Sequence, residues 1–148
     1  MKSILLGAVA ALTATSSAAW AVCGTARDAC EIESGSYHIK LPLEARADMP
    51  VVVFLHGYGS SGSNAISLDR MVEPMRARGY AIIAPNGLPR SEDGTGPNSW
   101  VFYPGWRGRD EISFLQEVVS DAAARFGTST ETVMRSGCSA GGFMVNYM

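Results

Sequence analysis

The sequence predicts an α/β fold, in which a mostly parallel β-sheet carries helices on both faces. Two uninterrupted apolar runs rich in β-branched residues, 50–55 and 80–84, are typical of strands that are covered on both sides. One segment between these runs and another after them have apolar residues at helical spacing. Strands that alternate with helices along a chain form crossover units, and such units build parallel sheets.

The composition is that of an ordinary globular protein of one domain. Of its 148 residues, 47% are hydrophobic and 18% are charged, a balance that argues against a disordered chain. Lys and Arg number 12 and Asp and Glu 14, so the net charge of -2 creates no strong field toward phosphate or anionic lipid. We therefore expect no nucleic-acid partner and look for the function in local chemistry.

The N-terminal segment 1–21 is predicted to be a signal peptide. A positive charge precedes the apolar run 4–12, which is too short to span a bilayer, and the small residues of 19–21 fit a cleavage site. The mature protein would then begin at Val22 and be secreted to the extracellular space or a periplasm, with no membrane association after cleavage. A membrane anchor or a buried helix is the alternative for this segment, whereas Val22 argues against a lipid anchor on Cys23.

The three cysteines divide into a pair and a single residue. Cys23 and Cys30 lie close together near the expected mature N-terminus, and export permits disulfides, so we predict that they pair. Cys138 is then the odd thiol. We interpret it as a small buried apolar side chain rather than as a reactive group.

The first half of the chain predicts three strands and one helix. Residues 37–42 alternate between apolar and polar side chains, as in a half-buried strand, so His38 should face solvent or a covering loop. The first buried strand follows at 50–55. Apolar residues at helical spacing then predict a helix over about 64–78, which Gly79 ends. The second buried strand begins directly after it.

The second half begins with a long segment, 86–108, that has no periodicity and holds several aromatic residues. Such a segment is more often functional or mobile than a simple connector. A helix should then run over 110–126 and end at Gly127. Its predicted buried face consists of Ile112, Leu115, Val119, Ala122 and Phe126. A third strand is predicted at 132–136, although Arg135 is unsuited to a buried strand.

A Gly-x-Ser-x-Gly motif at 137–141 is the strongest candidate for catalytic chemistry. Alone the motif is weak evidence, but here it joins a predicted strand to a segment, 140–148, that can form a helix. This is the context of a nucleophile elbow, whose sharp turn needs small residues at Gly137 and Gly141. Ser139 is therefore the candidate nucleophile. The alternative is a passive serine in a glycine-rich turn.

The residues after the first buried strand support the same interpretation. The loop that begins at His56 can bring a backbone N–H opposite the elbow, so the N–H groups of Tyr58 and Ala140 are the candidate oxyanion hole. We interpret His56 as a structural residue that orients this loop rather than as a proton-transfer group.

These motifs together resemble a known family, the secreted esterases of the polyhydroxybutyrate depolymerase and feruloyl or acetylxylan esterase group within the α/β-hydrolases. The segments that carry the resemblance are 52–57, 84–87, 110–115 and 136–144. It implies an α/β-hydrolase sheet and hydrolysis of an ester through an acyl-enzyme on Ser139, without cofactor or metal. Arg135 departs from the usual apolar residue of the family, and Cys138 occupies a variable position.

The partners of the serine are the largest departure from the family. In α/β-hydrolases the triad acid and histidine follow the nucleophile in the chain. Residues 140–148 contain no Asp, Glu or His, and both histidines, His38 and His56, precede Ser139. We therefore interpret 22–148 as the N-terminal portion of a single α/β-hydrolase domain whose C-terminal part is missing, through a truncated product or an incomplete sequence.

Two classes of function follow from these observations. The first is a secreted serine esterase similar to polyhydroxybutyrate depolymerases, with feruloyl or acetylxylan esterase activity as the alternative; the substrate would be a polyester or a plant-polysaccharide ester. The second is a non-enzymatic exported remnant that binds a ligand through the aromatic segment 100–106. An open reading frame beyond Met148 that supplies a later Asp and a final His would favour the first.

Overall fold

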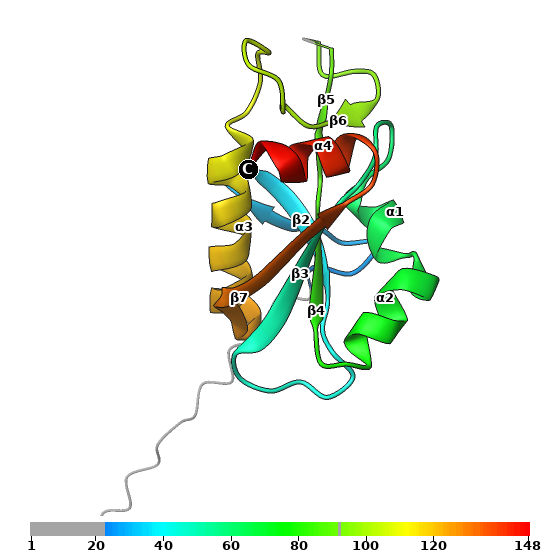
Figure 1. The fold of residues 1–148 in the computed structure, drawn as a ribbon, viewed down its shortest axis with the longest axis vertical. Helices are drawn as coiled ribbons and strands as arrows, with labels where there is room; N and C mark the ends of the chain where they lie inside the picture. Colours follow the sequence, from blue (N-terminus) through cyan, green and yellow to red (C-terminus); the bar gives the residue numbers. More distant parts are fainter. Residues whose placement is uncertain (1–22, 92) are drawn as a thin grey trace, which may run out of the picture.

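The computed structural model describes residues 23–91 and 93–148, and these form a five-stranded sheet with helices on both faces (Figure 1). The expected signal peptide and the start at Val22 lie outside the described residues. The strand order is β1-β2-β4-β3-β7, with β3, β4 and β7 parallel and β1 and β2 antiparallel to their neighbours. The strands span Cys30–Ile32 (β1), Gly35–Lys40 (β2), Met49–Leu55 (β3), Ala81–Pro85 (β4) and Thr128–Gly137 (β7).

The helices cover the sheet in two pairs. Helices α1 (Gly62–Ile66) and α2 (Asp69–Arg76) cover one face, and α3 (Glu111–Phe126) and α4 (Ala140–Tyr147) cover the other. Alternate residues of β3 divide between the two cores, because successive side chains of a strand point to opposite faces. The predicted fold class is therefore confirmed. Among the described residues, no helix is both long and apolar enough to cross a membrane.

The N-terminal part is fastened to the sheet by the predicted disulfide. Cys23 and Cys30 are bonded, which confirms the pairing. Their loop covers β2, and the carbonyl oxygen of Thr25 lies 2.5 Å from Nδ1 of His38. His38 thus faces a covering loop, one of the two placements expected for it. The strand is nevertheless buried on both sides rather than half-buried, since His38 is enclosed as fully as its neighbours.

The helix predicted over 64–78 is divided into two short helices, α1 and α2. The break lies at Leu68, whose ψ of 72° leaves the helical region. The side chain before it contributes, because the hydroxyl of Ser67 donates to the carbonyl of Ser63 at 2.8 Å and competes with regular helix continuation. Gly79 lies in the left-handed region, with φ of 87°, shortly after α2 ends.

Helix α3 begins and ends where the sequence predicts. Asp110 accepts hydrogen bonds from two backbone N–H groups of the first turn, and Gly127 ends the helix with φ of 70°. The predicted buried face is wrong at its first residue. Ile112 is 36% exposed, because the helix turns Phe114 and its neighbours onto the sheet instead. The fully or nearly fully buried apolar residues of α3 are Phe114, Leu115, Val118 and Ala122.

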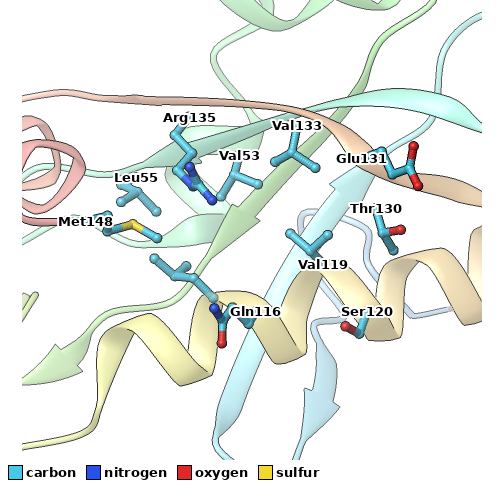
Figure 2. Close-up of a pocket in the computed structure, with 11 residues that line it drawn as sticks. Val53, Leu55, Gln116, Val119, Ser120, Thr130, Glu131, Val133, Arg135 and Met148 are labelled. Atoms are coloured by element: carbon cyan, nitrogen blue, oxygen red, sulfur yellow. The ribbon is translucent and has the colours of Figure 1, made fainter.

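Strand β7 is longer than predicted and lies at the edge of the described sheet. Its pairing partner among the described residues is β3. This position explains why Arg135 is tolerated, since its side chain is exposed rather than buried. A hollow of about 340 Å³ lies between β7 and α3, lined in part by Val53, Val119 and Val133 (Figure 2).

Candidate active site

Ser139 occupies a sharp turn between β7 and α4. Its backbone has φ of 52° and ψ of -118°, a conformation that few residues other than glycine adopt. A strained backbone of this kind persists where the surrounding structure enforces it, and it is frequent at active sites. The side chain of Ser139 is exposed and does not cap the helix that it precedes. The strand, turn and helix context expected for the motif is thus present.

The two glycines of the motif are required by close backbone packing. A Cβ at Gly137 would overlap the backbone of Gly141 across the turn. A Cβ at Gly141 would overlap the carbonyl oxygen of Leu55, at the end of β3. Gly142 differs, because a Cβ there would lie 3.5 Å from the carbonyl oxygen of Gly137, an ordinary contact. The motif therefore fixes the elbow against the end of the neighbouring strand.

The loop after β3 lies beside the serine. A Cβ added at Gly57 would be 3.5 Å from Cβ of Ser139, and the N–H of Cys138 donates to the carbonyl of Leu55 at 3.1 Å. Tyr58 follows directly in this loop, and Ala140 is the first residue of α4. Free N–H groups at a helix start and in such a loop suit a developing oxyanion. The assignment of these two N–H groups stays a prediction.

His56 holds the loop rather than serving Ser139 as a base. Its Nδ1 lies 2.8 Å from the carbonyl oxygen of Gly57, and its Nε2 accepts from the N–H of Gly87 at 3.0 Å. Both ring nitrogens are therefore engaged. Burial lowers the pKa of His56 and so favours the neutral ring. The indole N–H of Trp100 donates to the carbonyl of His56 at 2.8 Å and fixes the residue from the other side.

The bond from His56 to Gly57 also sets the direction of the candidate oxyanion donor. The carbonyl of Gly57 and the N–H of Tyr58 belong to one peptide unit, which is planar and trans, so they point in opposite directions. An imidazole that holds the carbonyl therefore holds the N–H as well. The sequence does not predict this contact, because residue types alone do not determine the orientation of a peptide plane.

A buried ion pair anchors both ends of the long segment 86–108. Nη2 of Arg109 lies 2.7 Å from Oε2 of Glu111, and it also donates to the carbonyl of Asn86 at 3.1 Å. Glu111 accepts from the N–H of Val101 at 3.2 Å. Burial raises the pKa of Glu111 despite the neighbouring guanidinium. The sequence does not predict this pair, because a Glu at the start of a helix ordinarily lies in solvent, near the positive end of the helix dipole.

Other expected features of the site have mixed outcomes. Cys138 is exposed, so its interpretation as a buried apolar side chain is wrong. It lies in the turn directly before the candidate nucleophile. His38 is held by Thr25, and residues 140–148 bring no acid or histidine to Ser139. Within 23–91 and 93–148, no group of three or more His, Cys, Asp or Glu side chains could hold a metal ion.

Comparison with known sequences finds neither a matching family model nor a matching curated protein. Comparison with solved structures gives clear matches. An acetyl xylan esterase from Aspergillus awamori superposes with a TM-score of 0.60 at 21% identity, over 76% of this chain and 40% of that one. An S-formylglutathione hydrolase from Agrobacterium tumefaciens gives 0.61 at 18% identity, over 77% and 48%.

A third structure, esterase PE8, is 26% identical with a TM-score of 0.50, and the match covers 77% of this chain and 55% of that one. The chain thus spans about half the length of these structures, or less. The solved structures it resembles are esterases and related hydrolases of the α/β-hydrolase kind. The described part of the chain has the α/β-hydrolase fold.

Proposed function

We propose that Ser139 is the nucleophile of a serine-dependent carboxylic ester hydrolase. The observation that carries the proposal is the backbone of Ser139, which is held at φ of 52° between two glycines packed against the end of β3. This conformation exposes the hydroxyl at the carboxyl end of the parallel strands. Ligands of open α/β sheets bind at that end.

The reaction would proceed in two acyl transfers. Oγ of Ser139 forms a bond to the carbonyl carbon of the ester, and its proton passes to a base. The N–H groups of Tyr58 and Ala140 stabilise the oxyanion. The bond from that carbon to the alcohol oxygen then breaks, the alcohol leaves with the proton, and water releases the acid from Ser139 by the same steps in reverse.

The base is the part that these residues do not supply. A serine hydroxyl is a weak nucleophile unless its proton is removed as it attacks. The imidazoles of His38 and His56 are held by backbone groups, and residues 140–148 contain no alternative. In this proposal the triad acid and histidine belong to sequence beyond Met148, and 22–148 is the N-terminal portion of the enzyme.

The proposed substrate is an ester outside the cell. The disulfide between Cys23 and Cys30 supports export, because such bonds persist in oxidising compartments. A polyester of the polyhydroxybutyrate kind is the first candidate, on the resemblance of the motifs. A feruloyl or acetyl ester of plant polysaccharide is the alternative, and the likeness to an acetyl xylan esterase is consistent with it.

The nucleophile can be tested on this chain with p-nitrophenyl butyrate and added imidazole as an external base. We expect the chain alone to hydrolyse the ester at a rate at most marginally above that of its Ser139→Ala variant, since loss of a triad partner costs about 10⁴-fold. Imidazole should increase the rate beyond its own hydrolysis of the ester in protein-free buffer, and this protein-dependent increase should be absent in Ser139→Ala and retained in Ser136→Ala. Butyrylation of Ser139, detected by mass spectrometry, would accompany it.

Two results would overturn parts of this proposal. Equal rates with and without Ser139 at every imidazole concentration, and no acyl group on Ser139, would exclude the serine as nucleophile. A robust rate without imidazole that vanishes in Ser139→Ala would show that a base exists within these residues, and the chain would then not be catalytically incomplete.

A further inference from the structure

A short part of the long segment, residues 98–101, lies against the loop that follows β3, and we call it the brace. It begins with strand β6 (Asn98–Ser99), which lies at the same end of the molecule as α4 in Figure 1. Trp100 of the brace is fully buried, and its ring packs beside the imidazole of His56 with centroids 4.9 Å apart. The first aromatic residue of the segment 100–106 is therefore enclosed within the protein rather than presented to a ligand.

The brace makes hydrogen bonds to the loop after β3 at three points. The indole N–H of Trp100 donates to the carbonyl of His56 at 2.8 Å. The backbone carbonyl of Asn98 accepts from the N–H of Gly59 at 2.9 Å, and the side-chain amide of Asn98 donates to the carbonyl of Ser60 at 3.3 Å. These bonds hold the loop both before and after the peptide unit that carries the candidate oxyanion donor.

That peptide unit is fixed at its carbonyl and free at its N–H. The carbonyl of Gly57 accepts from Nδ1 of His56 at 2.8 Å and from the N–H of Ser60 at 3.1 Å. The N–H of the same unit, on Tyr58, donates to no residue in 23–91 or 93–148. Because a trans peptide unit is planar, fixing the carbonyl also fixes the N–H, which points the opposite way. An unpaired N–H beside Ser139 is available to an oxygen atom of a bound substrate.

The brace is itself fixed to the rest of the fold. The N–H of Val101 donates to Glu111, at the start of α3, and Glu111 is paired with Arg109. The loop after β4 packs against the other side, since a Cβ at Gly87 would overlap the carbonyl oxygen of Ser99. A segment held in this way can keep the loop after β3 in one position.

We propose that Trp100 is a positioning residue of the oxyanion hole, assisted by Asn98. Together they hold the loop so that the N–H of Tyr58 stays unpaired and directed at the acyl oxygen of an ester bound at Ser139. This inference rests on the proposed function of Ser139, and it applies whichever acyl chain the ester carries. Positioning of this kind matters because a donor stabilises an oxyanion only where it is already aligned, and a misplacement of about 1 Å can cost about 10²-fold in rate.

The oxyanion hole can be tested without the missing base, by use of 1,1,1-trifluorohexan-2-one as an equilibrium probe. Oγ of Ser139 forms a bond to the carbonyl carbon, and its proton passes to the ketone oxygen to give a hemiketal. At higher pH that proton is lost to solvent, which leaves an oxyanion. A base changes the rate of this addition but not its extent. Fluorine NMR separates the adduct from the free ketone and its hydrate, and Ser139→Ala supplies the background.

The variant that isolates the indole N–H carries 3-benzothienylalanine at position 100, which keeps the shape of Trp100 but has sulfur in place of the N–H. We expect its ionised adduct to be about 10- to 100-fold weaker, so that the adduct ionises about one to two pH units higher. Asn98→Ala removes the side-chain donor to Ser60 and should weaken the adduct by about 2- to 12-fold. Val118→Ala is the control, because it removes buried methyl groups from the same core as Trp100. It should lower the stability of the fold without moving the pH of ionisation.

The outcomes separate this inference from the function on which it rests. If the parent chain forms an adduct at Ser139 and the folded benzothienylalanine variant forms it with the same affinity and ionisation pH, the nucleophile stands and the role of Trp100 is wrong. A weaker adduct that ionises at the unchanged pH would also overturn that role, since it would show a general loss of structure. If the parent forms no adduct that depends on Ser139, the proposed function is overturned, and the inference with it.

Discussion

Nε2 of His56 accepts a hydrogen bond from the backbone N–H of Gly87 at 3.0 Å, although the two residues follow different strands of the sheet. The N–H can only donate, so Nε2 carries no proton, and the proton of the neutral ring is on Nδ1, where it is donated to Gly57. One imidazole thus joins the loop after β3 to the loop after β4. Both loops border the candidate active site.

The fold should lose stability as His56 becomes protonated. Burial lowers the pKa of His56 in the folded state below its ordinary value of 6.5, so the unfolded chain binds the proton more tightly. The stabilisation contributed by neutral His56 is complete above pH 6.5, and it is lost as the pH falls from 6.5 toward the lowered pKa of His56 in the folded state. Urea unfolding between pH 7.5 and pH 5 should show a falling free energy of unfolding.

The matched variant for this measurement is His56→Gln, which keeps a polar side chain but does not titrate. Its free energy of unfolding should be lower at neutral pH and change less between pH 7.5 and pH 5. The raised pKa of Glu111 acts in the opposite sense and remains in both proteins, so it cancels in the comparison. If the free energy of unfolding changed equally with pH in the two proteins, His56 would not be the source of the pH dependence.

Two neighbouring glycines of α4 should respond oppositely to the same substitution. Gly141→Ala places a methyl group against the carbonyl of Leu55 and should cost about 3 kcal/mol or prevent folding, because backbone must move. Gly142→Ala meets only ordinary contacts and should stabilise by about 0.5–1 kcal/mol, since alanine is the better helix former. Thermal unfolding of the two variants checks both signs.

The elements that local pattern determines were predictable, and those that depend on distant neighbours were not. The buried strands β3 and β4, the caps of α3 and the turn at Ser139 each follow from residues that act within a few positions of each other. The disulfide is also local, since Cys23 and Cys30 close a short loop. These features were predictable because the residues that cause them are close together in the sequence.

The missed features have causes elsewhere in the fold. Cys138 is exposed because nothing in the described structure packs over the outer side of the elbow, and no local pattern states this. The buried charge of Glu111 is acceptable only because Arg109, Val101 and the helix start converge on it. The roles of Ser139, Tyr58 and Ala140 remain predictions, which the proposed acylation test addresses.

The ion pair between Arg109 and Glu111 should hold the long loop in place. Arg109→Met removes one charge of a buried pair, strands the carboxylate of Glu111, and loses the contact to the carbonyl of Asn86. Breaking such a pair typically costs about 3–5 kcal/mol. Asp121→Asn is the control, because its partner Arg125 is more exposed and the loss there should be smaller. Urea unfolding compares the two variants, and similar losses would argue against a special role for Arg109.

Strand β7 should make the isolated chain associate with itself. Its outer edge has no partner strand among the described residues, and unpaired apolar edges recruit other chains. The side chains of the strand add apolar surface on both faces. Val133 lines the hollow beside α3 (Figure 2), and Met134 is 48% exposed on the side of α2. The positive charge of Arg135 opposes self-association at this edge only in part.

A charge on the β7 edge should therefore reduce self-association. Light scattering of the chain should show aggregates that grow with concentration, and Met134→Glu should lessen them because a buried interface would have to enclose the carboxylate. Leu43→Glu is the control, because it adds the same charge at a residue that is 65% exposed and lies near arginine side chains. Leu43 is far from β7 in the sequence, so this substitution should have little effect on self-association. A monomeric wild-type chain with a sharp, reversible thermal transition would contradict the prediction, since it would mean that the edge of β7 is protected within these residues. Equal reduction by both glutamates would instead assign the effect to net charge, because like-charged chains repel wherever the charge is placed.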